Sequence, residues 1–384
     1  MRRYLLACLI AALVTTALGT WLAFPYIKAA ALVIDLAGIS TPVRRMLPVR
    51  VNAVNSRDVS VPTRYGPVAA RLYLPEGTAT RTLALFPGVH SGGVDEPRLA
   101  AFARRLAATG VNVLSMPLPE LRRYRLTPTS TDAIEDGANW LLADRTLTPA
   151  GHLGLAGVSF AGGLALVAAG RPSLVDRIDL VVALGSHADL PRVMTYLCTG
   201  QLADGRVQPP HDYGIVITLL AAIPHLVPPD QAGALHQAVL DYLDASSASS
   251  TDEARSIVMF ADVQRATAAL PEPSRTLMTM VNDRNVKALG PKLLPYIEEL
   301  GGFPALSPDR SPPARAPVFL LHGSEDNVIP AQETAFIATY LQAHGNSHVE
   351  WLLTPLLSHA NVKPAGAVDA WKLIAFWKQI LAER

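Results

Sequence analysis

The chain has 384 residues, half of them apolar, and its 33 basic and 32 acidic residues leave a formal net charge of +1. This composition supplies a core for one large domain or two ordinary ones. The balanced charge argues against nucleic acids and other polyanions as main partners, so small or neutral substrates fit better. The two cysteines, Cys8 and Cys198, lie in separate segments and predict no disulfide framework.

The N-terminal segment has two arginines and then an uncharged run from Tyr4 to Ile27, which ends at Lys28. The run is long enough to cross a bilayer as a helix. A cleaved signal sequence has the same basic start, but it normally has a shorter apolar stretch and a clearer cleavage site. We therefore expect residues 1–28 to form an uncleaved membrane anchor, with a cleaved signal sequence as the alternative.

The positive-inside rule does not decide the orientation of this helix, because basic residues flank the uncharged run on both sides. The signal-like layout alone favours an exported catalytic domain, periplasmic or extracellular, tethered by this single helix. Cys8 then lies within the membrane. Residues 29–56 form a juxtamembrane segment, whose apolar part is expected along the membrane surface.

From about Val59 short apolar strands alternate with helical segments, which is the pattern of an α/β sheet. A helix at 130–145 is expected to be capped by Ser130 or Thr131. The expected elements of the first part of the core, 57–186, are two strands that turn at 65–67, strands at 82–88, 111–117, 151–159 and 178–186, and helices at 96–110, 130–145 and 160–169. The alternation resumes in the second part, 314–384, with strands at 317–323 and 348–354 and helices at 331–345 and 367–383.

Between these two parts, residues 187–313 form a helical insertion broken by proline, glycine and the sequence "SSASS" at 246–250. Its stretches at 213–227 and 254–270 carry more apolar surface than a polar cover would need. An acyl-binding pocket or a cover that meets the bilayer is one interpretation. The other is that these faces pack on one another and on the core. The serine-rich sequence is either a hinge or a solvated loop.

Ser159 lies where a short apolar strand passes directly into a helix of small apolar residues. Strand and helix backbones approach closely at such a turn, so it needs small residues two positions to either side, and Gly157 and Ala161 meet that need. The turn strains the serine backbone, lifts its hydroxyl above the sheet and places helix amides beside it. Ser159 is therefore a candidate nucleophile, with helix capping as the alternative.

A serine nucleophile needs an adjacent base, usually histidine, which a carboxylate orients. Two partners follow later strands: Asp326 in "HGSEDNVIP" and His359 in "LLSHAN". Separately, each could be a turn aspartate or a loop histidine. Their order along the chain, serine then acid then histidine, with each residue just past a strand, favours a catalytic triad.

At these residues the sequence resembles the α/β-hydrolase superfamily, over roughly 59–186 and 314–383. The resemblance implies a mostly parallel central sheet flanked by helices, with the insertion as a helical lid over the site. Carried over by position, it makes Ser159 the nucleophile, His359 the general base and then acid, and Asp326 the orienting carboxylate.

Two positions bear on that assignment. Glu325 is the rival acid, but its place in the turn fits the family's pattern less well. The family's usual glycine two residues after the nucleophile is Ala161 here, a variant that the family tolerates.

The same resemblance places an oxyanion hole at the backbone amides of Val89, after the first buried strand, and Phe160, after the nucleophile. The first loop reads "FPGVHSGG", and its glycines let the backbone approach a ligand. The family's frequent His-Gly is Pro-Gly in this loop. His90 is a candidate substrate contact, and a packed or solvated loop histidine is the alternative.

The sequence therefore predicts a serine hydrolase that cleaves a carboxylic ester through an acyl-enzyme intermediate. No cofactor or metal is expected, because the chain shows no Cys/His metal pattern, phosphate-binding loop or dinucleotide fingerprint. The expected partners are a small-molecule ester, acyl or lipid-like esters included, and the membrane through the N-terminal helix, without nucleic acid. A peptidase or thioesterase with the same triad and a catalytically idle membrane-tethered binding protein are the alternatives.

Overall fold

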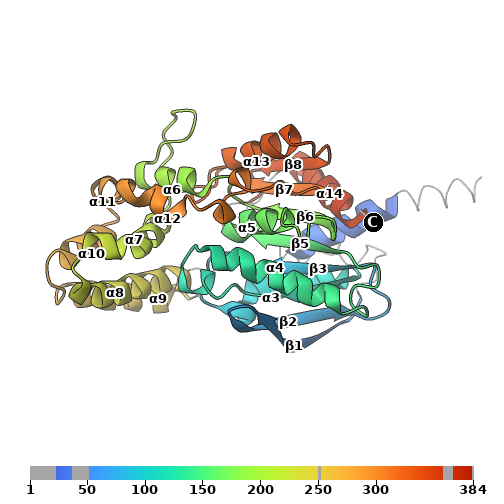
Figure 1. Ribbon diagram of the computed structural model, residues 1–384, viewed down its shortest axis with the longest axis horizontal. Helices are drawn as coiled ribbons and strands as arrows, with labels where there is room; N and C mark the ends of the chain where they lie inside the picture. The colour runs from blue at the N-terminus through green and yellow to red at the C-terminus, as the bar shows by residue number, and fades with distance from the viewer. Residues whose placement is uncertain (1–22, 37–51, 250–251, 358–365, 383–384) are drawn as a thin grey trace, which may run out of the picture.

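The computed structural model describes residues 23–36, 52–249, 252–357 and 366–382. A sheet of eight strands forms its centre, and a group of helices projects beyond one end of the strands (Figure 1). The strands are β1 Val54–Thr63, β2 Gly66–Pro75, β3 Arg81–Phe86, β4 Val111–Ser115, β5 Leu153–Val158, β6 Ile178–Leu184, β7 Val318–Gly323 and β8 Val349–Thr354.

The strands follow one another across the sheet in the order β1-β2-β4-β3-β5-β6-β7-β8. β1 and β2 form the predicted antiparallel hairpin, but Thr63 pairs with Gly66, so the turn lies at residues 64–65 and not at 65–67. β2 also pairs antiparallel with β4, and each neighbouring pair from β4 to β8 is parallel. The carboxyl ends of the parallel strands therefore lie along one edge of the sheet.

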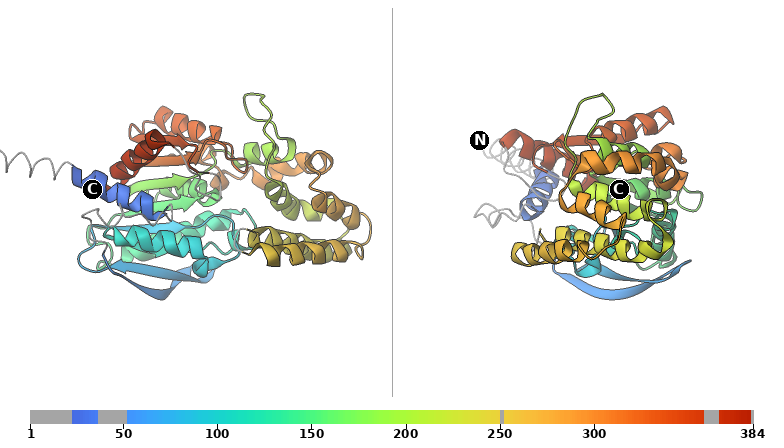
Figure 2. Two further views of the ribbon diagram at one scale, coloured as in Figure 1. Left: turned by 180° about the vertical axis from the view of Figure 1, so that it is seen from behind. Right: turned by 90° about the vertical axis from the view of Figure 1, so that its left-hand side faces the viewer.

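Each central strand contributes to two cores, because successive side chains point to opposite faces of a sheet. In β3, Ala84 and Phe86 belong to one buried cluster, whereas Leu83 and Leu85 belong to the other. Helices α4, α5 and α13 pack on the first face, and α3, α14 and helix 23–36 on the second (Figure 2). These helices are α3 Pro97–Ala108, α4 Pro128–Ala143, α5 Phe160–Ala169, α13 Gln332–Ala343 and α14 Ala367–Ala382.

The helical insertion lies between β6 and β7, beyond the carboxyl ends of the strands (Figure 1). Nine residues of α7 are buried, so its apolar surface mainly packs inside the protein, whereas α9 exposes Ile257 and Val258. The helices of the insertion are α6 Leu190–Thr199, α7 Asp212–Leu226, α8 Pro229–Ala248, α9 Glu253–Thr267, α10 Ser274–Asn282, α11 Val286–Leu293 and α12 Ile297–Gly301. Short 3₁₀ helices are η1 Gly93–Asp95, η2 Leu121–Arg123, η3 Leu294–Tyr296, η4 Pro304–Leu306 and η5 Pro308–Arg310.

Two further local predictions are wrong. α4 begins at Pro128, because proline suits the first helical position and its fixed φ starts the helix before Ser130 and Thr131. Both residues are then buried inside the helix, and the Thr131 hydroxyl donates to Ala305 O. The serine-rich sequence is not a loop throughout, since Ser246 and Ser247 still belong to α8.

Most of the predicted membrane anchor, 1–28, lies outside the described residues. Its last part belongs to helix 23–36, whose Ala29 and Leu32 are buried against the second face of the sheet rather than presented to a membrane surface. Tyr26 of this helix stacks on Trp371 of α14, with 5.3 Å between ring centroids. In the part of the chain that the structure describes, no helix combines the length and apolarity needed to cross a bilayer.

Candidate active site

Ser159 occupies a strained turn between β5 and α5. Its φ of 57° and ψ of −134° lie in a region that residues other than glycine rarely adopt, at a cost of about 1–3 kcal/mol. A Cβ on Gly157 would lie 2.4 Å from Ala161 O, and a Cβ on Gly88 would lie 2.8 Å from Ser159 Cβ. The close approach of strand and helix that the sequence predicts is therefore present at Gly157, and the loop that carries Gly88 packs against the serine as well.

The backbone of Ser159 is fixed by the sheet and by the helix. Its N–H donates to Leu184 O of the neighbouring strand at 2.7 Å, and its carbonyl accepts from Gly162 N–H at 3.0 Å. Its side chain makes no capping hydrogen bond to α5, although it stands at the N-cap position. Capping therefore does not explain why a serine occupies this turn.

Asp326 lies in the turn after β7 and is 2% exposed. Its Oδ1 accepts hydrogen bonds from the N–H groups of Val328 at 2.8 Å and Ile329 at 3.0 Å, which fixes the orientation of the carboxylate. Glu325, the rival acid, is exposed. Of the two carboxylates, only that of Asp326 is buried in the turn and fixed by these backbone hydrogen bonds.

The ends of β5, β6 and β7 bring Ser159 and Asp326 to the same edge of the sheet. β6 lies between the other two strands, and its end carries Gly185, with φ of 62°. A Cβ on Gly185 would lie 3.7 Å from Asp326 Oδ2, so this carboxylate oxygen faces the end of the middle strand. Ser159 is bonded through its N–H to Leu184, one residue before Gly185.

His359 lies outside the described residues, and its role as the base stays a prediction. The preceding strand is placed: β8 pairs with β7 in parallel, with Thr354 opposite Gly323, so both strands end at the edge that carries Ser159.

His322 supports the acid turn, a role that the sequence analysis missed. It is 1% exposed, and its Nε2 donates to Ile329 O at 2.9 Å and lies 3.5 Å from Asp326 Oδ2. Its Nδ1 shares a hydrogen bond of 2.7 Å with the Thr334 hydroxyl. Its position four residues before Asp326, in the same turn sequence, was the available signal.

The loop after β3 carries the predicted oxyanion residue Val89. Gly88 lies against Ser159, as the contact described above shows, so the loop passes beside the candidate nucleophile. Val89 O accepts a hydrogen bond from the Tyr213 hydroxyl of α7 at 3.2 Å. Phe160, the other predicted oxyanion residue, is the first residue of α5, where backbone N–H groups have no partner within the helix.

His90 has contacts inside the protein at both ring nitrogens. Its Nδ1 accepts from Gly92 N–H at 2.8 Å, so its Nε2 carries the proton and donates to Ser247 Oγ of α8 at 3.1 Å. Burial lowers the pKa of the His90 imidazole, which favours this neutral form. The contacts match those of a packed loop histidine, and its role as a substrate contact stays a prediction.

Further contacts join the insertion to both sides of the site. On the oxyanion side, the Tyr124 hydroxyl, after η2, donates to Asp244 Oδ1 of α8 at 2.7 Å. On the acid side, Gln208 Nε2 donates to Asp326 O at 2.8 Å, and the Tyr196 hydroxyl donates to Asn327 O at 3.2 Å. No local pattern in the sequence marks these pairs, because their members are more than 100 residues apart.

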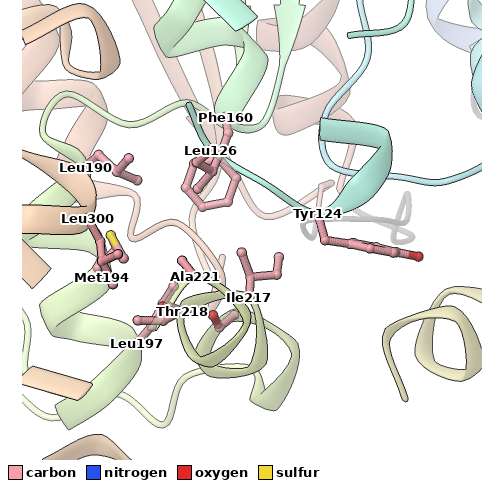
Figure 3. A pocket seen from close by; sticks show the side chains of 11 residues that line it. Tyr124, Leu126, Phe160, Leu190, Met194, Leu197, Ile217, Thr218, Ala221 and Leu300 are labelled. Carbon is pink, nitrogen blue, oxygen red and sulfur yellow. Dashed lines mark hydrogen bonds between the residues drawn. The ribbon is translucent and has the colours of Figure 1, made fainter. Parts of the chain in front are cut away.

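An apolar pocket lies between Phe160 and the insertion (Figure 3). Its side chains come from the segment after η2, from α5 and from α6, α7 and α12, and none of them is charged. It is lined by Tyr124, Leu126, Phe160, Leu190, Met194, Leu197, Gly214, Ile217, Thr218, Ala221 and Leu300. Phe160, the residue after the candidate nucleophile, is part of this lining, and the cavity volume is about 20 Å³. Within the described segments, no group of three His, Cys, Asp or Glu residues could hold a metal ion.

No protein-family model matches the sequence, and no curated protein matches it. A hyperthermophilic esterase from the archaeon Pyrobaculum calidifontis is similar in structure, at 16% identity and a TM-score of 0.45, over 94% of this chain and 92% of that chain. The thermostable carboxylesterase EstE1, cloned from a metagenomic library, is 16% identical with a TM-score of 0.47, over 95% and 97%. Est1E from Butyrivibrio proteoclasticus is 13% identical with a TM-score of 0.45, over 85% and 98%.

The class of fold is inferred from the architecture of this chain itself. A mostly parallel sheet with helices on both faces, and a serine with positive φ between β5 and the buried α5, are the features that the sequence predicts from its resemblance to the α/β-hydrolase superfamily. The chain resembles that superfamily in its fold, with a helical insertion between β6 and β7.

Proposed function

We propose that the protein is a serine hydrolase that cleaves carboxylic esters through an acyl-enzyme intermediate. The observation that carries the proposal is the strained backbone of Ser159, because a non-glycine residue with positive φ persists only where the surrounding structure enforces it. Gly157 and Gly88 have no room for a side chain, so the chain around the turn packs closely and holds this serine in place.

The chemistry assigns a role to each predicted residue. His359 removes the proton of the Ser159 hydroxyl, and the oxygen attacks the ester carbonyl carbon. The amides of Phe160 and Val89 stabilise the negative charge that develops on the carbonyl oxygen. The protonated His359, oriented by Asp326, gives its proton to the leaving alcohol as the ester bond breaks. A water activated by the same histidine then hydrolyses the acyl-enzyme and regenerates the serine.

The pocket supports the substrate class. Its lining has no charged side chain, and the polar side-chain groups are the hydroxyls of Tyr124 and Thr218. The lining offers no partner for a charged peptide side chain, whereas an uncharged acyl group placed against it would leave no charge unpaired. This favours a substrate with an apolar acyl group over one with a charged group at that position.

Active-site labelling tests the nucleophile. A fluorophosphonate probe should label the wild-type protein and fail to label Ser159→Ala. The matched control is Ser186→Ala, which removes another buried serine just past the neighbouring strand β6 and should leave labelling intact. Folded wild-type protein that takes no label would refute the enzyme and favour the idle binding protein.

A substrate panel separates ester hydrolysis from its alternatives. We expect turnover of nitrophenyl esters of rising acyl length, abolished in Ser159→Ala. Thioesters and peptide amides are run beside them. Turnover of amides or thioesters with none of esters would overturn the ester assignment while keeping the nucleophile.

A further inference from the structure

An exposed aromatic patch lies where helix 23–36 meets α14, the two helices that pack together on the second face of the sheet. Phe24 is 50% exposed, Trp371 57% and Val368 67%, and Tyr26 is partly exposed beside them. We call these four residues the aromatic patch. Large apolar side chains gathered at one place on a surface indicate an interaction site more often than scattered ones do.

The patch has a fixed geometry that joins the two helices. The ring of Tyr26 stacks on Trp371 with an angle of 3° between the ring planes. Lys378 Nζ lies 5.4 Å from the centroid of the same tyrosine ring. Tyr26 is thus held by α14, and Phe24 lies in the same first turn of helix 23–36. Val368 precedes Trp371 by three residues, so both lie on one side of α14.

The chain itself indicates what covers the patch. The uncharged run from Tyr4 to Ile27 leads directly into helix 23–36 and includes Phe24 and Tyr26. Three lysines, Lys28, Lys372 and Lys378, accompany the aromatic residues on these two helices, against two aspartates. Tryptophan and tyrosine with nearby lysines are typical of the boundary between the apolar interior of a bilayer and its headgroups.

A second exposed apolar surface, on α9, lacks these features. Ile257 and Val258 on α9 are 65% and 60% exposed, but their helix begins with Glu253 and carries an ion pair between Asp262 and Arg265. The aromatic ring of α9, Phe260, packs edge-on against the buried Tyr242, with 5.2 Å between ring centroids, and the acidic Asp252 precedes the helix directly. This surface therefore provides a control of matched exposure.

We propose that the aromatic patch docks on the headgroup region of a lipid bilayer and fixes the orientation of the protein on the membrane. Helix 23–36 and the insertion lie at opposite ends of the molecule (Figures 1 and 2). The insertion and its pocket then face away from this bilayer, so the substrate arrives from the aqueous side. This replaces the interpretation in which the insertion meets the bilayer, and it does not depend on the reaction catalysed.

Site-specific quenching tests the docking. The full chain carries Cys8→Ser and Cys198→Ala, and receives one new cysteine at either of two exposed positions, Val368→Cys or Ile257→Cys. Each variant is labelled with the same fluorophore and reconstituted into vesicles of phosphatidylcholine and phosphatidylglycerol. Fluorescence is compared with vesicles whose lipids carry bromine on the acyl chain near the headgroup. We expect it to fall by about half for the label at 368 and to stay unchanged for the label at 257, because brominated lipids quench only on contact.

Each other outcome overturns the proposal. A chain that floats with vesicles while the label at 368 stays unquenched is tethered without docking through the patch. Quenching at 257 in place of 368 reverses the orientation. A chain that does not associate with vesicles lacks the membrane contact altogether. Thermal unfolding of both labelled variants confirms that they are folded, and because no turnover is measured, the result is separate from that of fluorophosphonate labelling.

Discussion

The sheet and the insertion contact the candidate active site in different ways. In the sheet, Ser159 and Asp326 follow parallel strands and are fixed by backbone hydrogen bonds within the core. The insertion reaches the site through single side chains, such as Tyr213 to Val89 O and Gln208 to Asp326 O.

This difference predicts that the sheet determines the rate of catalysis and that the insertion determines substrate preference. Backbone hydrogen bonds and close packing against glycines hold the nucleophile and the acid in fixed positions, and catalysis requires such fixed positions. The insertion supplies most of the pocket lining and can change its shape with little effect on the strand ends. Substitutions in the sheet should therefore lower turnover of every substrate, and substitutions in the insertion should change which substrate is preferred.

After the loss of the nucleophile itself, the largest effect is expected at the acid. Asp326→Asn keeps an oxygen that can accept from the amides of Val328 and Ile329, so the turn should stay folded while the negative charge is lost. We expect kcat to fall by about 10⁴-fold for all esters, because an uncharged partner no longer stabilises the histidine as an imidazolium. The matched control is Glu325→Gln, one residue earlier and exposed. If this control lost activity and Asp326→Asn kept it, the acid assignment would be wrong.

The same contrast explains what the sequence could predict. The requirement for Gly157 and Ala161 around Ser159 is local, so five consecutive residues were enough to expect the turn. The succession of strands and helices along the chain followed from alternating apolar runs, whereas the order of the strands across the sheet was not predicted. In contrast, Tyr213 and Val89 are separated by 124 residues and His90 and Ser247 by 157, and nothing near either member marks the pair. Such contacts depend on how the insertion packs, which no local pattern encodes.

A second prediction concerns the pocket. Ala221 of α7 lines it and is exposed on its other side, so a larger side chain can be placed there with little risk to folding. Ala221→Phe should lower kcat/KM for long acyl esters by about 10- to 100-fold, because losing apolar contacts in a pocket costs about 1–3 kcal/mol. Short acyl esters should be unaffected. Ala221→Ser, which hardly changes the volume, is the control, and equal losses for short and long esters would show that the pocket does not bind the acyl chain.

The sheet and the insertion also meet in a cluster of charges at the start of α6. Glu333 of α13 accepts from the N–H groups of Ala188 and Asp189 and pairs with Arg192. Asp309 of η5 lies beside this cluster, with its Oδ2 3.5 Å from Arg192 Nη2. Its Oδ1 is buried and has no hydrogen-bond partner among the described residues. Burial and the nearby Asp189 carboxylate raise the pKa of Asp309 from 3.8 to about 6.

The smallest effect is expected at this junction, and it depends on pH. Because the folded protein holds the Asp309 proton more tightly than the unfolded chain, its contribution to stability is complete below about pH 4 and is lost as the pH rises through about 6. Asp309→Asn stays uncharged throughout. The variant should match the wild type near pH 4 and be more stable by about 1–2 kcal/mol at pH 8 in denaturant unfolding. Asp262→Asn, on the exposed surface of α9, is the control and should show no such rise. If Asp309→Asn raised the free energy of unfolding equally at every pH, the Asp309 carboxylate would be charged over the whole range, and the expected rise of its pKa would be wrong.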